Sequence, residues 1–369
     1  MAKETNNSEG IGPSQMRILL VGGSGHVGKA LTRRFLGAGH DVVVLSRRPS
    51  PAAGAEGRHA RTVAWDGRTL GPWSVELDGA DVVMNLCGRS VNCRYSAPNR
   101  REIMESRVVP TRLIGQAIRG LKAPPRIWMN ASTATIYRHA LDRGMDEATG
   151  EIGGNERGVP ASWGFSIEVA KRWEEALFAG YTPGTRRIAL RAAVVMTPDR
   201  GSIFDVFAGL VRCGLGGTVG SGEQFVSWIH EWDFLRAIEH LIEHEEMDSV
   251  VNVSSPAPVP NREFMAVLRE AWGVKIGLPA SRWMVEIGTW LLRTEPELVL
   301  KSRRVIPRRL LESGFRFEFP EWSEAAKDLV ARREGKPKTQ VQETNLGRPH
   351  PTAAVSEGQL PRRDEGANT

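Results

Sequence analysis

Short apolar runs alternate with longer amphipathic stretches along the first 200 residues of the chain. A short apolar run is typical of a buried strand, and apolar residues at helical spacing predict a helix packed on one face. The predicted strands are 18–21, 41–46, 81–86, 126–131 and 187–195, and the predicted helices are about 29–36, 99–119 and 165–179. This alternation predicts an α/β fold with a doubly wound parallel sheet, which binds ligands at the carboxyl ends of its strands.

The pattern changes at three places along the chain. Residues 1–15 are polar and predict a flexible N-terminus, and residues 16–200 form a predicted α/β domain whose sheet later residues could complete. From residue 201 to 334 a mixed, helix-rich pattern predicts a smaller C-terminal substrate lobe. Residues 335–369 contain almost no large apolar side chain and predict a disordered tail.

Glycines follow the first predicted strand in the pattern Gly22-x-x-Gly25-x-x-Gly28. A glycine turn between a parallel strand and a helix leaves backbone N–H groups and the positive helix end free to bind a diphosphate. Glycines also mark ordinary turns, so the interpretation depends on the neighbouring strands. The predicted dinucleotide loop consists of Gly22, Gly23, Ser24, Gly25, His26, Val27 and Gly28.

The second predicted strand ends in Ser46, Arg47 and Arg48, where a first βαβ unit presents its ribose-binding residue. An acidic residue there would accept hydrogen bonds from the 2′-hydroxyl of NAD, whereas guanidinium groups bind a 2′-phosphate. The sequence therefore predicts NADP as the cofactor and NAD as the less favoured one. The alternative is that both arginines are solvated residues that open the loop at 49–51.

Composition is that of an ordinary globular protein, with 41% apolar and 25% charged residues. Three cysteines are too few for a disulfide framework, which agrees with a reducing compartment. The most apolar helical stretch, 284–292, contains Glu286 and is too short to span a bilayer, and the N-terminus has no apolar signal core. We therefore expect a cytoplasmic protein without a membrane partner.

The formal net charge is +6, and the densest basic cluster is Lys301-Ser302-Arg303-Arg304 with Arg308-Arg309. A nucleic-acid surface would explain it, but no interleaved aromatic residues or DNA-binding motif accompany it. We interpret the cluster as a solvated helix face and expect no nucleic-acid partner. An anionic cofactor accounts for part of the positive charge.

Two motifs resemble short-chain dehydrogenase/reductases. Asn85-Leu86-Cys87-Gly88 is similar to their Asn-x-Ala-Gly motif, and residues 132–137, Ser-Thr-Ala-Thr-Ile-Tyr, resemble the Ser-Ser-Ala-x-Val-Tyr stretch of extended, epimerase-like members. The resemblance implies that Leu86, Cys87 and Gly88 lie at the cofactor. From the residue type alone, we interpret Cys87 as a small apolar filler.

Further stretches resemble the epimerase family proteins that carry a C-terminal domain of unknown function, an atypical subgroup of the NAD-dependent epimerase/dehydratase type. The resemblance covers about residues 16–332 and implies a Rossmann-type, NAD(P)-binding fold, with no assigned substrate. The matching stretches are Ser106-Arg107-Val108 with Thr111, Lys171-Arg172-Trp173-Glu174, residues 215–222, Trp228-Ile229-His230 with Asp233, and Pro307-x-Arg309-Leu310 with Gly314-Phe315.

The superfamily's catalytic tyrosine and lysine, four residues apart on one helix face, are missing. The three tyrosines, Tyr95, Tyr137 and Tyr181, are followed four places on by Asn99, Leu141 and Thr185. If Trp173-Glu174 sets the register, the two positions fall on Ser166 and Ala170, and Lys171 points about 100° away around the helix.

A substitute group would then have to exchange the substrate proton. Ser132, Thr133 and Tyr137 are the candidates, because hydroxyl groups there could hydrogen-bond a substrate oxygen. A hydroxyl at a strand end also caps turns, and Tyr137 fits core packing better than catalysis. On the substrate side, Arg107 could reach the active-site edge or pair with a carboxylate. His230 could act there too, although a structural hydrogen bond to Asp233 or the backbone is preferred.

We expect no metal site. His240 and His244 lie four apart on a predicted helix, but glutamates surround them and no third ligand motif is visible. The favoured function is NADP-dependent hydride transfer on a small carbonyl or hydroxyl compound, with epimerisation through a transient ketone as one form. The alternative is a non-catalytic NADP-binding protein with a structural or regulatory role. By analogy with extended members, a homodimer would form through the helix that begins near Phe165.

Overall fold

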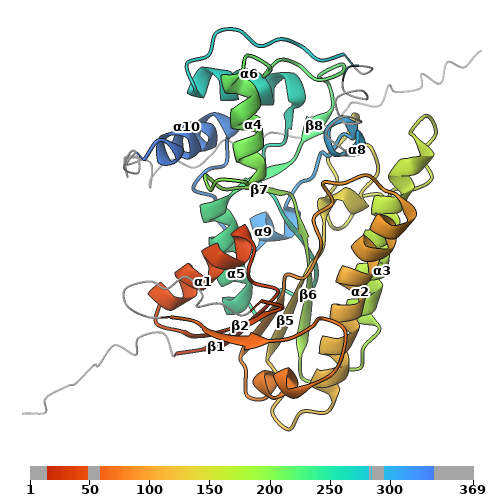
Figure 1. The fold of residues 1–369 in the computed structure, drawn as a ribbon, viewed down its shortest axis with the longest axis vertical. Helices are drawn as coiled ribbons and strands as arrows, with labels where there is room; N and C mark the ends of the chain where they lie inside the picture. The colour runs from red at the N-terminus through yellow and green to blue at the C-terminus, as the bar shows by residue number, and fades with distance from the viewer. Residues whose placement is uncertain (1–14, 49–58, 282–283, 285–294, 336–369) are drawn as a thin grey trace, which may run out of the picture.

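The computed structural model describes residues 15–48, 59–281, 284 and 295–335. Its main element is a seven-stranded sheet in the order β10-β6-β5-β4-β1-β2-β3, with every neighbouring pair parallel (Figure 1). The strands are β1 (Arg17–Val21), β2 (Asp41–Ser46), β3 (Arg61–Ala64), β4 (Val82–Asn85), β5 (Ile127–Ala131), β6 (Arg186–Ala192) and β10 (Ser249–Val253). The predicted doubly wound parallel sheet is confirmed.

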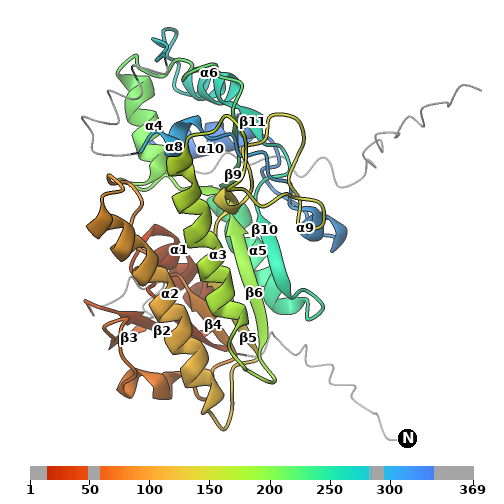
Figure 2. The ribbon, with the colours of Figure 1, turned by 90° about the vertical axis from the view of Figure 1, so that its right-hand side faces the viewer.

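Helices cover both faces of the sheet (Figures 1 and 2). Helices α1 (His26–Gly37) and α5 (Glu231–Glu243) pack on one face, and α2 (Ala97–Arg119) and α3 (Gly164–Phe178) pack on the other. Successive side chains of β1 enter opposite cores, since Ile18 packs with α1 and α5 while Leu19 packs with α2 and α3. A strand buried on both faces must be apolar throughout, which explains the unbroken apolar run.

The strand order reverses beside β1. The chain continues from β1 to β2 and β3 on one side, and then returns to β4, β5 and β6 on the other. The loops after β1 and β4 therefore diverge, and this leaves a crevice at the carboxyl edge between them. Both the glycine loop and the loop that begins at Leu86 lie at this edge.

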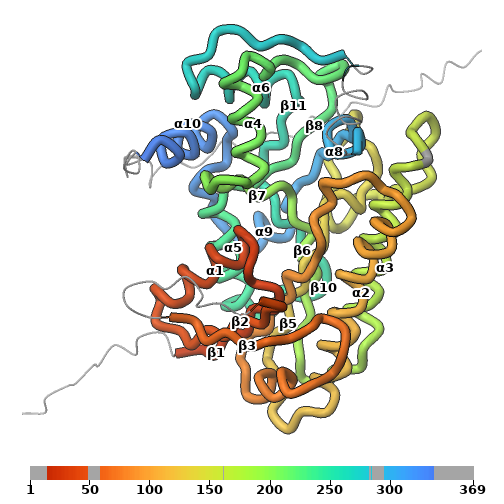
Figure 3. The backbone as a smooth tube through the Cα atoms, in the orientation of Figure 1, coloured from red at the N-terminus to blue at the C-terminus, as the bar shows by residue number. Residues whose placement is uncertain are grey.

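A second lobe lies beyond the carboxyl edge of the sheet (Figure 3). The chain enters it after β6 and returns through α5 to form β10 in the large sheet. Stacked aromatic rings of Phe264 and Trp322, with Trp228 beside them, form its core. Its elements are β7 (Val194–Met196), α4 (Ile203–Arg212), β8 (Phe225–Val226), β9 (Trp228–His230), β11 (Val259–Pro260), α6 (Asn261–Ala271), α8 (Glu297–Leu300), α9 (Arg308–Glu312) and α10 (Trp322–Arg333).

Several expectations concern residues outside the described ranges. They are the flexible N-terminus up to residue 14, the loop at 49–51, most of the apolar stretch 284–292, and the tail from residue 336 onward. Within the part of the chain that the structure describes, no helix combines the length and the apolar composition needed to cross a bilayer.

Candidate functional site

The glycine loop between β1 and α1 is tightly built. Gly22 has a φ of +74°, and a Cβ atom there would lie 2.8 Å from Sγ of Cys87. A Cβ atom on Gly28 would lie 2.3 Å from the carbonyl oxygen of Gly23, so α1 can pack against the loop only with glycine at this position. A Cβ atom on Gly25 would have no described atom within 4 Å. The loop is closed on the protein side at Gly22 and Gly28 and open at Gly25.

The amino end of α1 is suited to an anion. Its first intrahelical bond runs from Lys29 N to Gly25 O at 2.9 Å, so the N–H groups of His26, Val27 and Gly28 have no carbonyl partner within the helix. No side chain in the described part of the chain caps this end, and its first turn has no acidic residue. Free N–H groups and the positive end of the helix dipole both favour a phosphate.

A cavity of about 360 Å³ opens at this helix end. One wall consists of the glycine loop and Leu86, as the sequence predicted. The opposite wall, which sequence reasoning missed, comes from β7, the loop after it and the first residue of α4. The lining residues are Gly22, Gly25, His26, Val27, Gly28, Leu86, Val194, Val195, Thr197, Ser202 and Ile203.

Thr197 places a polar side chain in the lining of this cavity. Its hydroxyl is buried and has no hydrogen-bond partner among the residues that the structure describes. The neighbouring Ser202 hydroxyl is occupied, since it donates to the Thr197 carbonyl oxygen at 2.9 Å and accepts from Asp205 N. A buried hydroxyl without a partner is costly, and a bound ligand would remove that cost. The cavity therefore fits a nucleotide with phosphate and polar sugar groups.

The residues after β4 pack against the glycine loop. Leu86 N donates to Val21 O at 2.8 Å, and Cys87 N donates to the Asn85 side chain at 3.1 Å. Asn85 also donates to Thr111 and Asn130, which joins β4 to α2 and β5. Burial raises the pKa of the Cys87 thiol to about 12, so the thiol stays neutral. Cys87 is placed as a small packing residue beneath Gly22.

Ser46, Arg47 and Arg48 lie at the end of β2, next to the glycine loop. Gly22 N donates to Leu45 O at 2.9 Å, which ties the loop to this strand end. The Ser46 hydroxyl accepts from Arg48 N at 3.2 Å. Both arginine side chains are exposed, and neither forms an ion pair with any described residue. They are available to a phosphate beside the loop.

Ser132 and Tyr137 belong to one buried network. Ser132 donates to Oε1 of Glu174 at 2.6 Å, and Arg191 donates two bonds to the same carboxylate at 2.8 and 2.7 Å. The Tyr137 hydroxyl accepts from Arg191 at 3.0 Å and donates to Oδ1 of Asn252 at 2.9 Å. Burial raises the pKa of Tyr137 above its usual value. These contacts are structural, and a catalytic role for either hydroxyl stays a prediction.

Thr133 caps the short 3₁₀ helix Ala134–Ile136, because its hydroxyl accepts from Thr135 N at 3.1 Å. This is the turn-capping alternative expected for a hydroxyl at a strand end. Thr133 is only half-buried, at the carboxyl end of β5. Hydrogen bonding to cofactor or substrate stays a prediction for this residue.

Arg107 lies on α2 beside the cofactor edge. Its guanidinium carbon would be 3.2 Å from a Cβ atom on Gly88, and it donates to the carbonyl oxygens of Ile103 and Arg89 at 3.0 Å each. The group stacks over the Trp173 ring, 5.1 Å from its centroid, and burial lowers the pKa of Arg107 to about 10. None of these bonds goes to a carboxylate, and a substrate-side role for Arg107 stays a prediction.

His230 is fully buried, and both ring nitrogens have partners. Nδ1 accepts from Trp232 N at 3.1 Å, and Nε2 lies 3.0 Å from Oδ2 of Asp328 on α10. Of the two expected structural partners, the backbone is the one observed, at Trp232 N, while the Asp233 carboxylate accepts from the N–H groups of Glu318 and Phe319. The contacts of His230 join α5 to α10, and its substrate-side role stays a prediction.

The solvated helix face predicted for Lys301–Arg304 is also wrong. This segment follows α8 as extended chain, and Lys301 is buried with its Nζ donating to Thr135 O at 2.9 Å. Arg303 donates to Oγ1 of Thr135 at 3.0 Å. Only Arg308, on α9, is exposed as expected. These cations thus donate to a carbonyl and a hydroxyl oxygen of Thr135, which is distant in the sequence. No local sequence pattern indicates these hydrogen bonds.

His240 and His244 are stacked, with ring centroids 3.6 Å apart, at the end of α5. His240 Nε2 lies 2.8 Å from the Ser313 hydroxyl, and His244 Nδ1 lies 2.9 Å from the His240 carbonyl oxygen. The two rings thus contact each other, and His240 also contacts the segment that contains Ser313.

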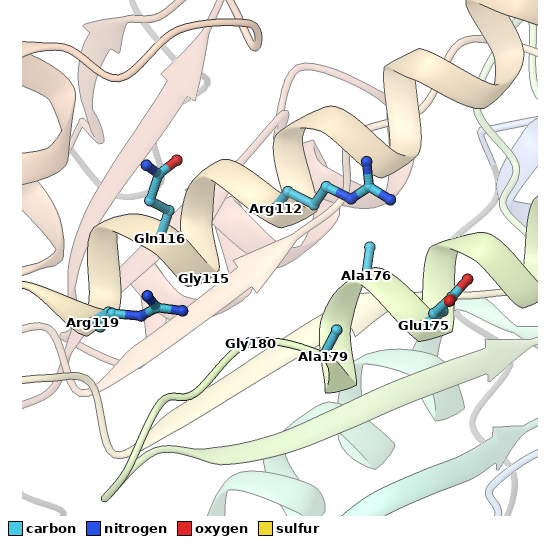
Figure 4. A pocket seen from close by; sticks show the side chains of 8 residues that line it. All are labelled: Arg112, Gly115, Gln116, Arg119, Glu175, Ala176, Ala179 and Gly180. Carbon is cyan, nitrogen blue, oxygen red and sulfur yellow. The ribbon is translucent and has the colours of Figure 1, made fainter.

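A groove of about 370 Å³ separates α2 from α3 on the outer surface (Figure 4). Arg112, Gln116 and Arg119 of α2 lie on one side, and Glu175, Ala176 and Ala179 of α3 lie on the other. Both arginines are exposed and have no ion-pair partner among the described residues. The groove is separate from the glycine-loop cavity.

The fold and the glycine-lined cavity define a Rossmann-type, NAD(P)-binding protein. The model of the NAD dependent epimerase/dehydratase family matches residues 18–254, and a domain of unknown function, DUF1731, matches residues 280–329. The chain belongs to the NAD-dependent epimerase/dehydratase family, and the resemblance inferred from its motifs is confirmed.

Several known proteins are similar along nearly the whole chain. Epimerase family protein SDR39U1 of Bos taurus is 31% identical over 324 residues, which cover 86% of this chain and 100% of that protein. Epimerase family protein YfhF of Bacillus subtilis is 28% identical and covers 86% of this chain and 99% of its own length. The solved structure of human SDR39U1 (isoform 2) with NADPH has a TM-score of 0.73 and 28% identity, and covers 85% of this chain and 99% of that one.

Proposed function

We propose that this protein binds NADP(H) and transfers hydride between it and a small carbonyl or hydroxyl compound. The observation that carries the proposal concerns Arg47 and Arg48, which form no ion pair with any described residue. They lie beside a helix end and a cavity hydroxyl that likewise have no side-chain partner in the described part of the chain. Human SDR39U1 with NADPH supports the choice of cofactor. When bound, the nicotinamide supplies hydride acceptance or donation.

Each part of the site has a task in this proposal. The N–H groups at the start of α1 bind the diphosphate, and the guanidinium groups of Arg47 and Arg48 bind the 2′-phosphate. Thr197 offers a hydroxyl to the cofactor from the opposite wall. The side chains that form the cavity exclude water from the reacting atoms.

The experiment has two stages. Calorimetry with NADPH and NADH should give tighter binding of NADPH, and no binding of either coenzyme to the folded protein would refute the proposal. Absorbance then follows oxidation of NADPH with a panel of carbonyl compounds and nucleotide sugars. Oxidation by any panel member supports an enzyme. Bound NADPH that never changes oxidation state supports the non-catalytic alternative.

A homodimer through α2 and α3 is the partner we propose. The groove between them presents two exposed arginines on α2 and an acidic residue, Glu175, on α3, so a copy related by a twofold axis can oppose unlike charges. Light scattering should give twice the monomer mass. The double variant R112E/R119E should shift the mass toward the monomer, whereas R68E, which changes an exposed arginine away from the groove, should not.

A further inference from the structure

A polar cluster forms at the start of α3. Ser166, in its first turn, falls on the position of the family's tyrosine in the register set by Trp173-Glu174, and its hydroxyl donates to Oε2 of Glu297 at 2.7 Å. The Tyr95 hydroxyl lies 3.3 Å from the same Ser166 oxygen. The three residues come from the loop after β4, from α3 and from α8, so only the folded chain brings them together (Figures 1 and 2).

Glu297 is buried, with 2% of its surface exposed. Its Oε2 atom accepts from Ser166, but Oε1 has no hydrogen-bond partner among the described residues. Lys301 Nζ lies 3.8 Å from Oε1 and donates instead to Thr135 O. Burial raises the pKa of Glu297 and lowers the pKa of Lys301 to about 8. A buried carboxylate oxygen without a donor is a position that can hold a proton.

Other charged groups surround the cluster. The charge of Arg303 lowers the pKa of Glu297, and the charge of Glu295 raises it. Glu295 also accepts from Tyr95 N at 2.6 Å. The charge of Arg303 lowers the pKa of Lys301, and the charge of Glu156 raises it. His139 lies on the same side, where its Nδ1 accepts from Ser302 N at 3.0 Å. The cluster thus combines acids and bases in nearly equal number around one buried carboxyl group.

The loop after β4 connects the cluster to the edge of the sheet where the cofactor cavity opens. The loop that carries Tyr95 begins at Leu86, which lines that cavity. Arg107, in contact with Gly88, lies close enough for the phenol of Tyr95 to act on the pKa of its guanidinium. Thr135, the acceptor for Lys301, lies in the short 3₁₀ helix Ala134–Ile136 that comes after β5.

We propose that Tyr95, Ser166 and Glu297 form the proton relay of this site, with the C-terminal domain supplying its terminal carboxyl group. This inference rests on the proposed function. The relay assigns a role in proton transfer to the domain of unknown function, because Glu297 and Lys301 both lie within residues 280–329.

The relay balances the hydride step. In the oxidative direction the substrate C–H bond breaks and its hydride, with both electrons, goes to NADP⁺. The substrate O–H proton passes to the Tyr95 oxygen as the Tyr95 proton passes to Ser166 Oγ and the Ser166 proton to Glu297 Oε2. The products are a carbonyl compound, NADPH and a neutral Glu297 carboxyl group. Reduction runs the same transfers backward.

The first test needs no substrate. Infrared difference spectra should show a protonated carboxyl band above about pH 5, where ordinary glutamates are ionised. The band should be absent from E297Q and retained in E312Q, which changes an exposed glutamate on α9. Addition of NADP⁺ should weaken the band, because the oxidative relay needs an ionised Glu297 carboxylate as its final proton acceptor.

The outcomes separate this inference from the proposed function. Calorimetric failure of NADP(H) to bind refutes the proposed function and the relay with it. Binding of NADP⁺ that leaves the Glu297 band unchanged, or a Glu297 that is ionised throughout, refutes the relay alone.

A kinetic test applies with any carbonyl compound that the wild type reduces. E297Q and S166A should lower kcat by about 100-fold or more with an unchanged Kd for NADPH, since a lost acid/base group costs that much. S166T should restore most of the rate, because threonine keeps the hydroxyl. E312Q should behave as the wild type. Wild-type kcat and an unchanged pH profile in E297Q would overturn the relay.

Discussion

Two buried ionic clusters flank the strand ends of this protein, and they differ in how fully their polar atoms are satisfied. In the first, the Glu174 carboxylate accepts two bonds from Arg191 and one from Ser132. In the second, the Glu297 carboxylate accepts one bond from Ser166, and its other oxygen has none from any described residue. A satisfied network fixes the structure, whereas an incompletely satisfied one has capacity to take up a proton.

The clusters also differ in where their members come from. Glu174 and Arg191 are 17 residues apart, on α3 and on the neighbouring strand β6. Ser166 and Glu297 are 131 residues apart and join the first lobe to the C-terminal domain. The first cluster belongs to the Rossmann-type framework. The second exists only when both parts of the chain are folded against each other.

The largest effect is expected from breaking the satisfied cluster. Glu174→Ala leaves the buried Arg191 guanidinium without its carboxylate, which should lower the free energy of unfolding by about 3–5 kcal/mol. Urea denaturation measures the change. The control is Arg172→Met, which removes the exposed pairs with Glu168 and Glu175 and should cost less than about 1 kcal/mol. Equal losses in the two variants would show that the buried network is not the stabilising one.

A change at Arg47 and Arg48 should act on binding and leave both clusters intact. Each guanidinium that donates to the 2′-phosphate contributes about 1.5–3 kcal/mol per bond, so the double variant R47S/R48S should bind NADPH at least about 10-fold more weakly. Its affinity for NADH should hardly change. Fluorescence titration with both coenzymes gives the ratio. R33S, an exposed arginine farther along α1, is the matched control, and an equal loss there would point to general charge.

Sequence reasoning located the glycine loop and these arginines because each motif is local. The turn and the start of α1 lie within seven residues of each other, from Gly22 to Gly28. The opposite wall of the cavity was missed, since Thr197 and Ser202 reach it only after the chain has completed β6. The periodicity of β6 predicts its existence, but not which loop residue after it will face a ligand.

The basic segment at 301–304 was misread for a related reason. A run of cations is usually solvated, and the composition of the segment gives no sign that Thr135 accepts bonds from both Lys301 and Arg303. The acceptor atoms lie about 166 residues away in the sequence. A hydrogen-bond partner at such a separation is a property of the fold, so a single sequence cannot reveal it.

A smaller effect is expected at Gly28, within the framework that the first cluster stabilises. Gly28→Ala places a methyl group against the Gly23 backbone, and overpacking of this kind costs about 1–3 kcal/mol. Thermal unfolding and NADPH titration should both show the loss. Gly37→Ala is the control, because a Cβ atom at this last residue of α1 meets nothing within 4 Å. A Gly28→Ala protein with wild-type stability and affinity would contradict the close approach.

The smallest effect is expected from titrating the second cluster. The pKa of Lys301 is lowered to about 8 in the folded protein, whereas an unfolded lysine titrates near its ordinary value of 10.5. Between these values the unfolded chain binds more protons, so the stability of the wild type should rise with pH relative to Lys301→Met. The change should stay within about 1–2 kcal/mol, because Glu297, 3.8 Å away, favours the charged ammonium. Denaturation of both proteins from pH 7.5 to about 10.5 measures it. Parallel stability curves would show that Lys301 keeps its proton in the native state, and the cluster would then be an ordinary ion pair.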